Sequence, residues 1–369
     1  MDPVSQAALG AVVGQAAGHR RLGYRAAALG AVAGALPDID VLFAVGGDYF
    51  DQLVLHRGIT HSLLFAPVAG PLLGWLVSAL ERRRGAPPEP GRRTAWMLVA
   101  TLALLSHPLL DYLTPYGTQL LLPFTDRRFA VNAMPIIDPV YTAVLLVGLI
   151  AAARIWRRRA AAVALATLAV STAYLGYGYA LNRAAEAEAV RQLAAQGVEV
   201  TRVAAFPTIL QVHYRRVVAR TPDTDRVGFV SMWRPCPIDW TVAPRGGDDA
   251  TAVQAFLDTR EGRIFDWFTM GWGRYRLVGD GERIQVRATD LRSGFTADPD
   301  RSIFNASAVV SLAGALVEPV RAGRDAADAS GRRLAALFRD TYAPVCRAAG
   351  DALRPAGSGA APPASSSSN

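Results

Sequence analysis

Apolar residues dominate the chain up to Leu181 and become sparser beyond it. A membrane-spanning helix needs about 20 predominantly apolar residues in succession. Several stretches are candidates to cross or enter a bilayer, of which the first is marginal and the last four are long enough. They are residues 4–18, 26–45, 62–80, 95–113, 139–155 and 160–181. This pattern predicts an all-α polytopic membrane domain over residues 1–181.

The second half alternates apolar and polar residues in short runs, which is typical of half-buried strands. Residues 182–196 are predicted to form a polar helix that leaves the membrane. Strands are predicted at residues 198–203, 209–218, 227–233, 275–278 and 283–288, and helices at residues 251–257 and 331–341. Together they indicate a small α+β domain over residues 182–350. Pro, Ala, Gly and Ser dominate residues 351–369, which predicts a disordered tail.

Arginine is unevenly distributed among the connections between the apolar stretches. Clusters of basic residues beside membrane spans mark the cytoplasmic side. Three connections are rich in arginine. The first contains Arg20, Arg21 and Arg25, the second Arg82, Arg83, Arg84, Arg92 and Arg93, and the third Arg154, Arg157, Arg158 and Arg159. The alternate connections contain few basic residues, namely Arg57 in one and Arg127 and Arg128 in the other. We therefore predict a multi-pass protein of the bacterial inner membrane whose C-terminal domain is extracytoplasmic.

The formal charge of +8 raises the question of nucleic-acid binding. No zinc-finger, RRM-like or basic-helix pattern accompanies that charge. Membrane topology accounts for the arginine clusters, so we predict membrane lipids as neighbours and no nucleic-acid partner.

The chain contains two cysteines, Cys236 and Cys346, both in the second half. They lack CxxC spacing, which excludes a zinc ribbon. An extracytoplasmic location would allow them to form a disulfide, because oxidising compartments permit one. Two separate buried thiols remain the alternative at this point.

The first segment with candidate chemistry is Leu-Pro-Asp-Ile-Asp at residues 36–40, at the end of an apolar stretch. Pro37 disfavours a continued helix. Asp38 and Asp40 are therefore expected on a turn, where carboxylates two residues apart can point the same way. The alternative is that both carboxylates only terminate the helix and interact with solvent, since Asp is common in turns.

The second segment is His-Arg-Gly-Ile-Thr-His-Ser at residues 56–62, just before an apolar stretch. His56 and His61 are five residues apart, so a loop rather than a helix face must bring them together. Gly58 gives that loop backbone freedom, and Arg57 could hold a phosphate or carboxylate through its planar guanidinium. An interfacial loop with helix-capping residues is the alternative.

The third segment spans residues 106–117 and contains His107 and Asp111. These two residues are four apart and so share one helix face. They lie near the outer end of an apolar stretch, where ionisable residues are costly and usually functional. The alternative is a hydrogen-bonded His–Asp pair that joins two helices.

The predicted topology brings all three segments to the same membrane face. Histidine and carboxylate side chains are ligands for one or two divalent ions, with zinc expected first and manganese or magnesium as alternatives. Such an ion can activate water for hydrolysis. The predicted ligands are Asp38, Asp40, His56, His61, His107 and Asp111. The predicted catalytic residues are Asp40, Arg57 and Asp111.

These motifs resemble those of the LexA-regulated, membrane-bound metal-dependent hydrolase family. The matching stretches are Pro37 to Asp40, His56 to Ser62, and His107 to Thr114, followed by Pro123, Phe124 and Asp126. The resemblance covers about residues 1–155 and implies a metal-dependent hydrolase. Members often carry a His at the position that aligns with Gln6, which is a poor ligand for transition metals. This departure implies either the loss of one metal or compensation by Asp2 or His19.

The predicted function is hydrolysis of an ester or phosphoester at the extracytoplasmic membrane face. A small-molecule, lipid or envelope-linked substrate fits that location. One alternative is a divalent-metal transporter or sensor that uses the same ligands without chemistry. Another is a structural membrane protein with a His/Asp hydrogen-bond network.

Overall fold

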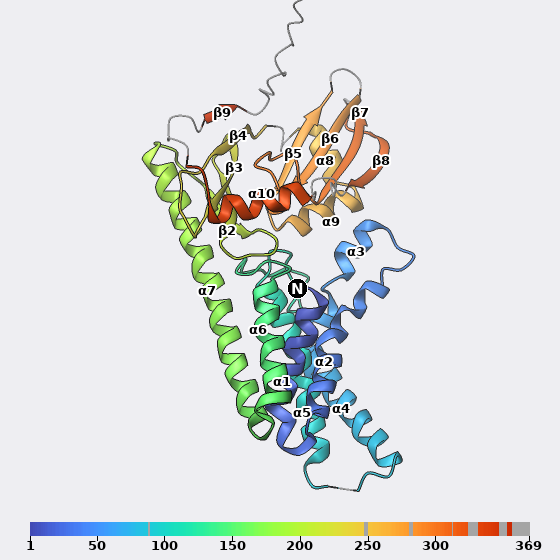
Figure 1. Cartoon of the computed structure of the whole chain (residues 1–369). Helices are drawn as coiled ribbons and strands as arrows, with labels where there is room; N and C mark the ends of the chain where they lie inside the picture. Colours follow the sequence, from blue (N-terminus) through green and yellow to red (C-terminus); the bar gives the residue numbers. More distant parts are fainter. Residues whose placement is uncertain are drawn as a thin grey trace, which may run out of the picture.

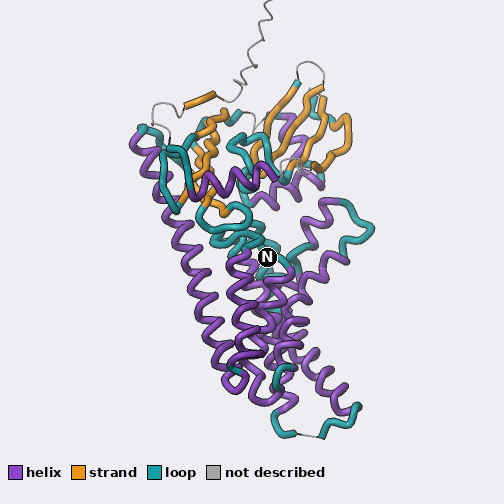
Figure 2. Tube along the Cα trace, in the orientation of Figure 1, coloured by secondary structure: helices purple, strands orange, loops and turns teal. Residues whose placement is uncertain are grey.

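The protein is described by a computed structural model that covers residues 1–87, 89–246, 250–279, 283–311, 313–323, 331–346 and 353–355. A helical bundle forms the N-terminal half, and a β-rich domain lies across one end of it (Figure 1). Figure 2 shows the strands gathered entirely in that second part. This arrangement confirms the predicted fold class of a helical membrane region followed by an α+β domain.

The helical half begins with α1 (Pro3–Leu22) and α2 (Arg25–Ala35). A 3-10 segment, η1 (Leu36–Leu42), follows. The rest comprises α3 (Tyr49–Leu55), η2 (Ile59–His61), α4 (Phe65–Arg83), α5 (Arg92–Tyr112), α6 (Pro139–Ile150), the turns η3 (Ala151–Ile155) and η4 (Arg157–Arg159), and α7 (Ala160–Ala195). The polar segment 182–196 is thus the continuation of the long helix α7.

Among the described residues, two helices are long and apolar enough to span a membrane, Arg92–Tyr112 and Arg157–Ala195. A third candidate is the pair Tyr49–His61 and Phe65–Arg83, which is bent by 65°. Fewer helices therefore qualify than the apolar stretches predict. The predicted stretch 26–45 is interrupted because α2 ends at Ala35, before the Pro37 turn.

Helices α1 and α2 pack backbone against backbone. A Cβ atom added at Gly10 would lie 2.2 Å from the Gly30 carbonyl oxygen, and one added at Gly34 would lie 2.7 Å from the Gln6 carbonyl oxygen. Small residues at helix interfaces permit such close approach in membrane proteins. The contact places the C-terminal end of α2, and with it η1, against α1 and α5.

The C-terminal domain contains two sheets. One has the order β1-β2-β3-β4-β9 and the other β5-β6-β7-β8. All neighbours are antiparallel except β9, which runs parallel to β4. The strands are β1 (Arg202–Pro207), β2 (Tyr214–Arg220), β3 (Thr224–Ser231), β4 (Trp240–Pro244), β5 (Gly273–Val278), β6 (Arg283–Asp290), β7 (Asn305–Ser311), β8 (Leu316–Gly323) and β9 (Leu353–Pro355). The helices are α8 (Thr251–Leu257), α9 (Arg260–Thr269) and α10 (Gly331–Tyr342).

Strand β9 lies within the predicted tail 351–369, whose other residues lie outside the described part of the chain. Cys236 and Cys346 form a disulfide in the C-terminal domain. The two cysteines therefore form a disulfide and are not two separate buried thiols. The bond connects the segment between β3 and β4 to the residues that follow α10.

The two halves share a hydrophobic core. Phe50 and Leu53 of α3 are buried with Phe256, Phe265 and Phe268 of the C-terminal domain. Arg215 on β2 is fully buried and donates hydrogen bonds to carbonyl oxygens of the helical half. The C-terminal domain is therefore packed firmly over the end of the bundle that carries the predicted site.

Candidate metal centre

Three chain segments meet at this end of the bundle. Segment η1 supplies Asp38 and Asp40, the stretch from α3 to η2 supplies His61, and the last two turns of α5 supply His107 and Asp111. The stretch from α3 to η2 turns sharply because Arg57 adopts a left-handed backbone, with φ of 60°.

Asp40 organises this turn. Its Oδ2 atom accepts hydrogen bonds from the Arg57 backbone N–H (2.8 Å) and from the Thr60 hydroxyl (3.2 Å). Its Oδ1 atom lies 2.9 Å from His56 Nδ1. The side chain of Asp40 is buried, so these contacts replace the water that the carboxylate loses.

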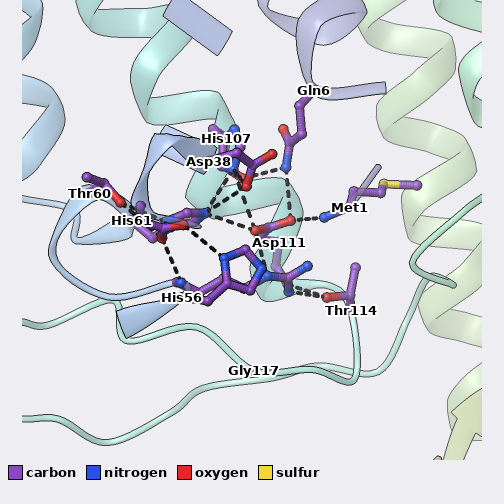
Figure 3. Close-up of polar contacts among 12 residues, drawn as sticks. Met1, Gln6, Asp38, His56, Thr60, His61, His107, Asp111, Thr114 and Gly117 are labelled. Atoms are coloured by element: carbon purple, nitrogen blue, oxygen red, sulfur yellow. Dashed lines mark hydrogen bonds and ion pairs between the residues drawn. The ribbon is translucent and has the colours of Figure 1, made fainter. Parts of the chain in front are cut away.

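Four side chains converge on one point, as Figure 3 shows. They are Asp38, His61, His107 and Asp111, and one ligand atom from each lies within 4.8 Å of all the others. The Nε2 atoms of His61 and His107 are 2.9 Å apart. Asp38 Oδ1 lies 3.5 Å and 3.4 Å from these two nitrogens, and Asp111 Oδ2 lies 3.3 Å and 3.6 Å from them.

The second nitrogen of each imidazole faces an acceptor. His107 Nδ1 lies 2.6 Å from the Gly34 carbonyl oxygen, and His61 Nδ1 lies 3.1 Å from Asp40 Oδ2. A neutral ring that donates from Nδ1 carries its lone pair on Nε2. This arrangement matches that of metal-bound histidines, whose outer nitrogen usually donates to a carboxylate or carbonyl.

Asp111 is fully buried and attracts several positive groups. Arg57 Nε lies 2.9 Å from Asp111 Oδ2, and the amino group of Met1 contacts Oδ1. Gln6 Nε2 donates to Oδ1 at 2.9 Å. Asp111 Oδ2 and Gln6 Oε1 are both buried without a hydrogen-bond partner among the described residues. Two buried acceptors without a donor are available to a cation.

Asp38 and Asp40 lie on η1, outside the candidate spans. Burial acts to raise the pKa of each carboxyl group. For Asp40, hydrogen bonds from His56 and His61 outweigh this effect and hold the pKa well below the usual range. Asp40 is therefore a carboxylate at neutral pH and can accept from His61 Nδ1.

The donor set fits a divalent ion. Two imidazole nitrogens and two carboxylate oxygens are ligands that zinc accepts in four-coordinate sites. With neutral imidazoles, the three Asp carboxylates outnumber the two positive groups beside them, Arg57 and the Met1 amino group, and the remaining negative charge attracts a cation. The cluster could thus hold a metal ion through Asp38, His61, His107 and Asp111.

The structure places the other predicted residues beside this cluster. Asp40 bonds to the outer nitrogen of His61, and His56 contacts Asp40 with its ring partly exposed. Metal ligation by Asp40 and His56 stays a prediction. Arg57 is buried, and its NH1 donates to Thr114 Oγ1 at 2.7 Å. Its predicted role as an anion clamp likewise stays a prediction.

Two groups that contact the site residues were not predicted from the sequence. The Gly34 carbonyl is a backbone group, and no side-chain motif marks it. The Tyr116 ring, which the Arg57 guanidinium contacts at 4.8 Å, falls within the third motif and carried no predicted role. Gln6 was recognised as a departure from the family pattern and lies fully buried at the centre. His19 contacts Gln15 and Tyr24 instead.

The bundle and its buried His/Asp cluster define a helical membrane protein with a candidate metal centre at one end. The sequence model of the YdjM inner membrane protein family matches residues 1–185, and the chain belongs to this family. Inner membrane protein YbcI of Escherichia coli (strain K12) is 34% identical over 128 residues, which are 34% of this chain and 69% of YbcI. No solved structure matches the chain. Family membership confirms the resemblance predicted from the motifs and the inner-membrane location.

Proposed function

We propose that this protein is a membrane-bound, metal-dependent hydrolase that cleaves an ester or phosphoester at the extracytoplasmic face. One observation carries the proposal: four ligand atoms of Asp38, His61, His107 and Asp111 converge, with the outer nitrogen of each imidazole held by an acceptor. A divalent ion bound there would supply the Lewis acidity that activates water for attack on an ester.

The residues around the cluster have distinct parts in this proposal. Asp40 orients His61 and keeps its Nε2 directed at the metal position. His56 is hydrogen-bonded to Asp40 and 27% exposed in its side chain, so it can exchange a proton with solvent. Arg57 is buried beside Asp111 and offsets its negative charge. Zinc is the metal we propose first.

The extracytoplasmic location has two supports. Residues 81–87, 89–93 and 154–159 include two arginine-rich connections and lie at the end of the bundle remote from the C-terminal domain (Figure 1). Arginine-rich connections face the cytoplasm. The disulfide between Cys236 and Cys346 is of a kind that persists in oxidising compartments.

Activity of the detergent-purified, zinc- or manganese-loaded protein tests the proposal. A panel of phosphomonoesters, phosphodiesters, phospholipids and carboxylesters should include a substrate whose hydrolysis is lost in Asp111→Asn. His19→Ala, which alters a histidine outside the cluster, is the matched control and should retain activity. If no substrate is turned over by the metal-loaded wild type, the hydrolase proposal is abandoned in favour of metal binding without chemistry.

A further inference from the structure

A cavity of about 480 Å³ lies where the helical half meets the C-terminal domain. Its walls come from the connection between α5 and α6 and from β1, α9 and the residues around β5. The lining side chains that bear on its chemistry are Arg127, Arg128, Arg202, Arg292, Trp267 and Trp272. The cavity has the size of sites that bind small organic ligands.

The cavity carries uncompensated positive charge. Arg292 is paired with Asp290 at 2.7 Å. Arg127, Arg128 and Arg202 form no salt bridge within the described part of the chain. One acidic residue, Asp126, is among the lining residues. Three arginines without a described salt bridge and one acidic residue therefore line the cavity, which favours an anionic ligand.

Arg128 and Arg202 are held in place by contacts that leave their charge unneutralised, and Arg127 is exposed. Arg128 is buried and donates to the carbonyl oxygens of Leu53 and Gly117, while its Nε has no hydrogen-bond partner. Arg202 donates to the Gly271 carbonyl oxygen and lies over the Trp272 ring at 4.1 Å. Rigid, preoriented guanidinium groups are suited to bidentate binding of phosphate.

Burial and the charges of neighbouring arginines act on both Arg128 and Arg202. Burial lowers the pKa of Arg128 to about 10, and the charges of Arg292 and Arg57 contribute to that decrease. Burial and the charges of Arg220 and Arg292 also lower the pKa of Arg202. A bound anion would relieve this repulsion.

Two side chains, the Tyr116 ring and Arg57, connect Arg128 of the cavity to the metal cluster. The guanidinium carbons of Arg57 and Arg128 both lie 4.8 Å from the centroid of Tyr116. Arg57 in turn contacts Asp111 of the metal cluster. A ligand at Arg128 would therefore be coupled to the proposed site of hydrolysis through Tyr116 and Arg57.

We propose that Arg127, Arg128 and Arg202 form a binding site for the phosphate group of an anionic ligand, and that this phosphate defines the substrate class of the metal centre. The second clause rests on the proposed function, whereas the phosphate site stands without it. The phosphate can belong to a lipid headgroup or be free inorganic phosphate.

Isothermal titration of the full-length protein in detergent tests the site. The probes are dihexanoylphosphatidic acid, inorganic phosphate, and dihexanoylglycerol, which lacks the phosphate. Phosphatidic acid should bind, and Arg127→Gln and Arg202→Gln should each weaken it about tenfold. Arg127→Lys should restore most of the affinity, and Arg83→Gln, which removes an exposed arginine from α4, should change nothing.

Comparison of the probes identifies the source of the phosphate. Binding of phosphatidic acid alone supports a lipid headgroup, and equal binding of inorganic phosphate supports a free anion. Equal binding of dihexanoylglycerol overturns the proposal, because the phosphate would then be irrelevant. Unchanged affinity in Arg127→Gln also overturns it, since this exposed residue can be replaced without loss of the fold.

Repeating the titration with His107→Ala and with EDTA separates this site from the hydrolase proposal. Binding that persists in both supports a phosphate site in the cavity, whether or not hydrolysis is ever observed. Binding that disappears in His107→Ala while it survives in Arg202→Gln would place the phosphate at the metal centre and overturn the inference.

Discussion

The Nε2 atoms of His61 and His107 face each other at 2.9 Å in a fully buried position. Because the Gly34 carbonyl and Asp40 hold the opposite ring nitrogens, both Nε2 atoms carry lone pairs when the rings are neutral. Two lone pairs at this distance repel each other. A cation between them removes the repulsion, and the nearby carboxylates of Asp38 and Asp111 favour a divalent one.

Asp40 is expected to act on the metal through His61. Asp40→Asn removes the carboxylate that accepts from His61 Nδ1, and loss of such an outer partner weakens metal affinity about 10- to 100-fold. Competition with a chromophoric chelator measures this affinity. At saturating zinc the variant should still bind the metal stoichiometrically. Complete loss of binding would show that Asp40 is itself a ligand.

Close packing of α1 and α2 is expected to support the site. In Gly30→Ala the new Cβ would lie 2.1 Å from the Gly10 carbonyl oxygen, and overpacking of this kind costs about 1–3 kcal/mol. Thermal unfolding in detergent should show a lowered Tm. Gly176→Ala on α7 is the matched control, because nothing lies within 4 Å of its Cβ position. A helical Gly→Ala change without a clash should raise stability. Equal effects of the two variants would argue against the tight α1–α2 contact.

Arg215 is expected to stabilise the packing of the C-terminal domain on the bundle. Its guanidinium satisfies the carbonyl oxygens of Asn132, Ala133 and Gly178 while fully buried. Arg215→Gln leaves acceptors unpaired and should destabilise the protein by about 1–3 kcal/mol. Arg183→Gln changes an arginine whose side chain is 65% exposed and should stay within about 0.5 kcal/mol of the wild type. Equal unfolding midpoints for both variants would contradict this role.

Cysteine accessibility tests the proposed extracytoplasmic location. In intact spheroplasts, Cys236 and Cys346 should react with a membrane-impermeant maleimide only after an impermeant reductant has opened their disulfide. The control is Arg83→Cys in a chain without the native cysteines, which should react only after permeabilisation. Labelling of Cys236 that requires permeabilisation would reverse the topology.

The sequence predicted the parts of the fold that depend on local pattern. The helix at residues 251–257 occurs as α8 (Thr251–Leu257), and the alternation in residues 283–288 marks β6. Strands β4, β7 and β8 were not predicted, and β1 begins four residues later than expected. Many strand side chains of this domain acquire their burial from α7 or from α3, α8 and α9, and a local pattern does not record such contacts.

In the candidate site, too, local motifs predicted some features, whereas others depend on tertiary contacts. Motifs with His and Asp indicated the four clustered residues because metal-ligating side chains are rare near membrane spans. Asp40 and His56 lie beside the four-residue cluster because the chain turns at Arg57. The positive φ of Arg57 could not be predicted from the motif. The cavity rich in arginine could not be predicted, because Arg128 and Arg202 lie far apart in the chain and meet only when the two halves pack.

Metal content of the purified protein tests the central claim most directly. Mass spectrometry should find stoichiometric divalent metal in the wild type and in His19→Ala, and none in His107→Ala or Asp111→Asn. Absence of metal from the wild type, even after reconstitution with zinc or manganese, would contradict the account and leave the His/Asp cluster as a structural network.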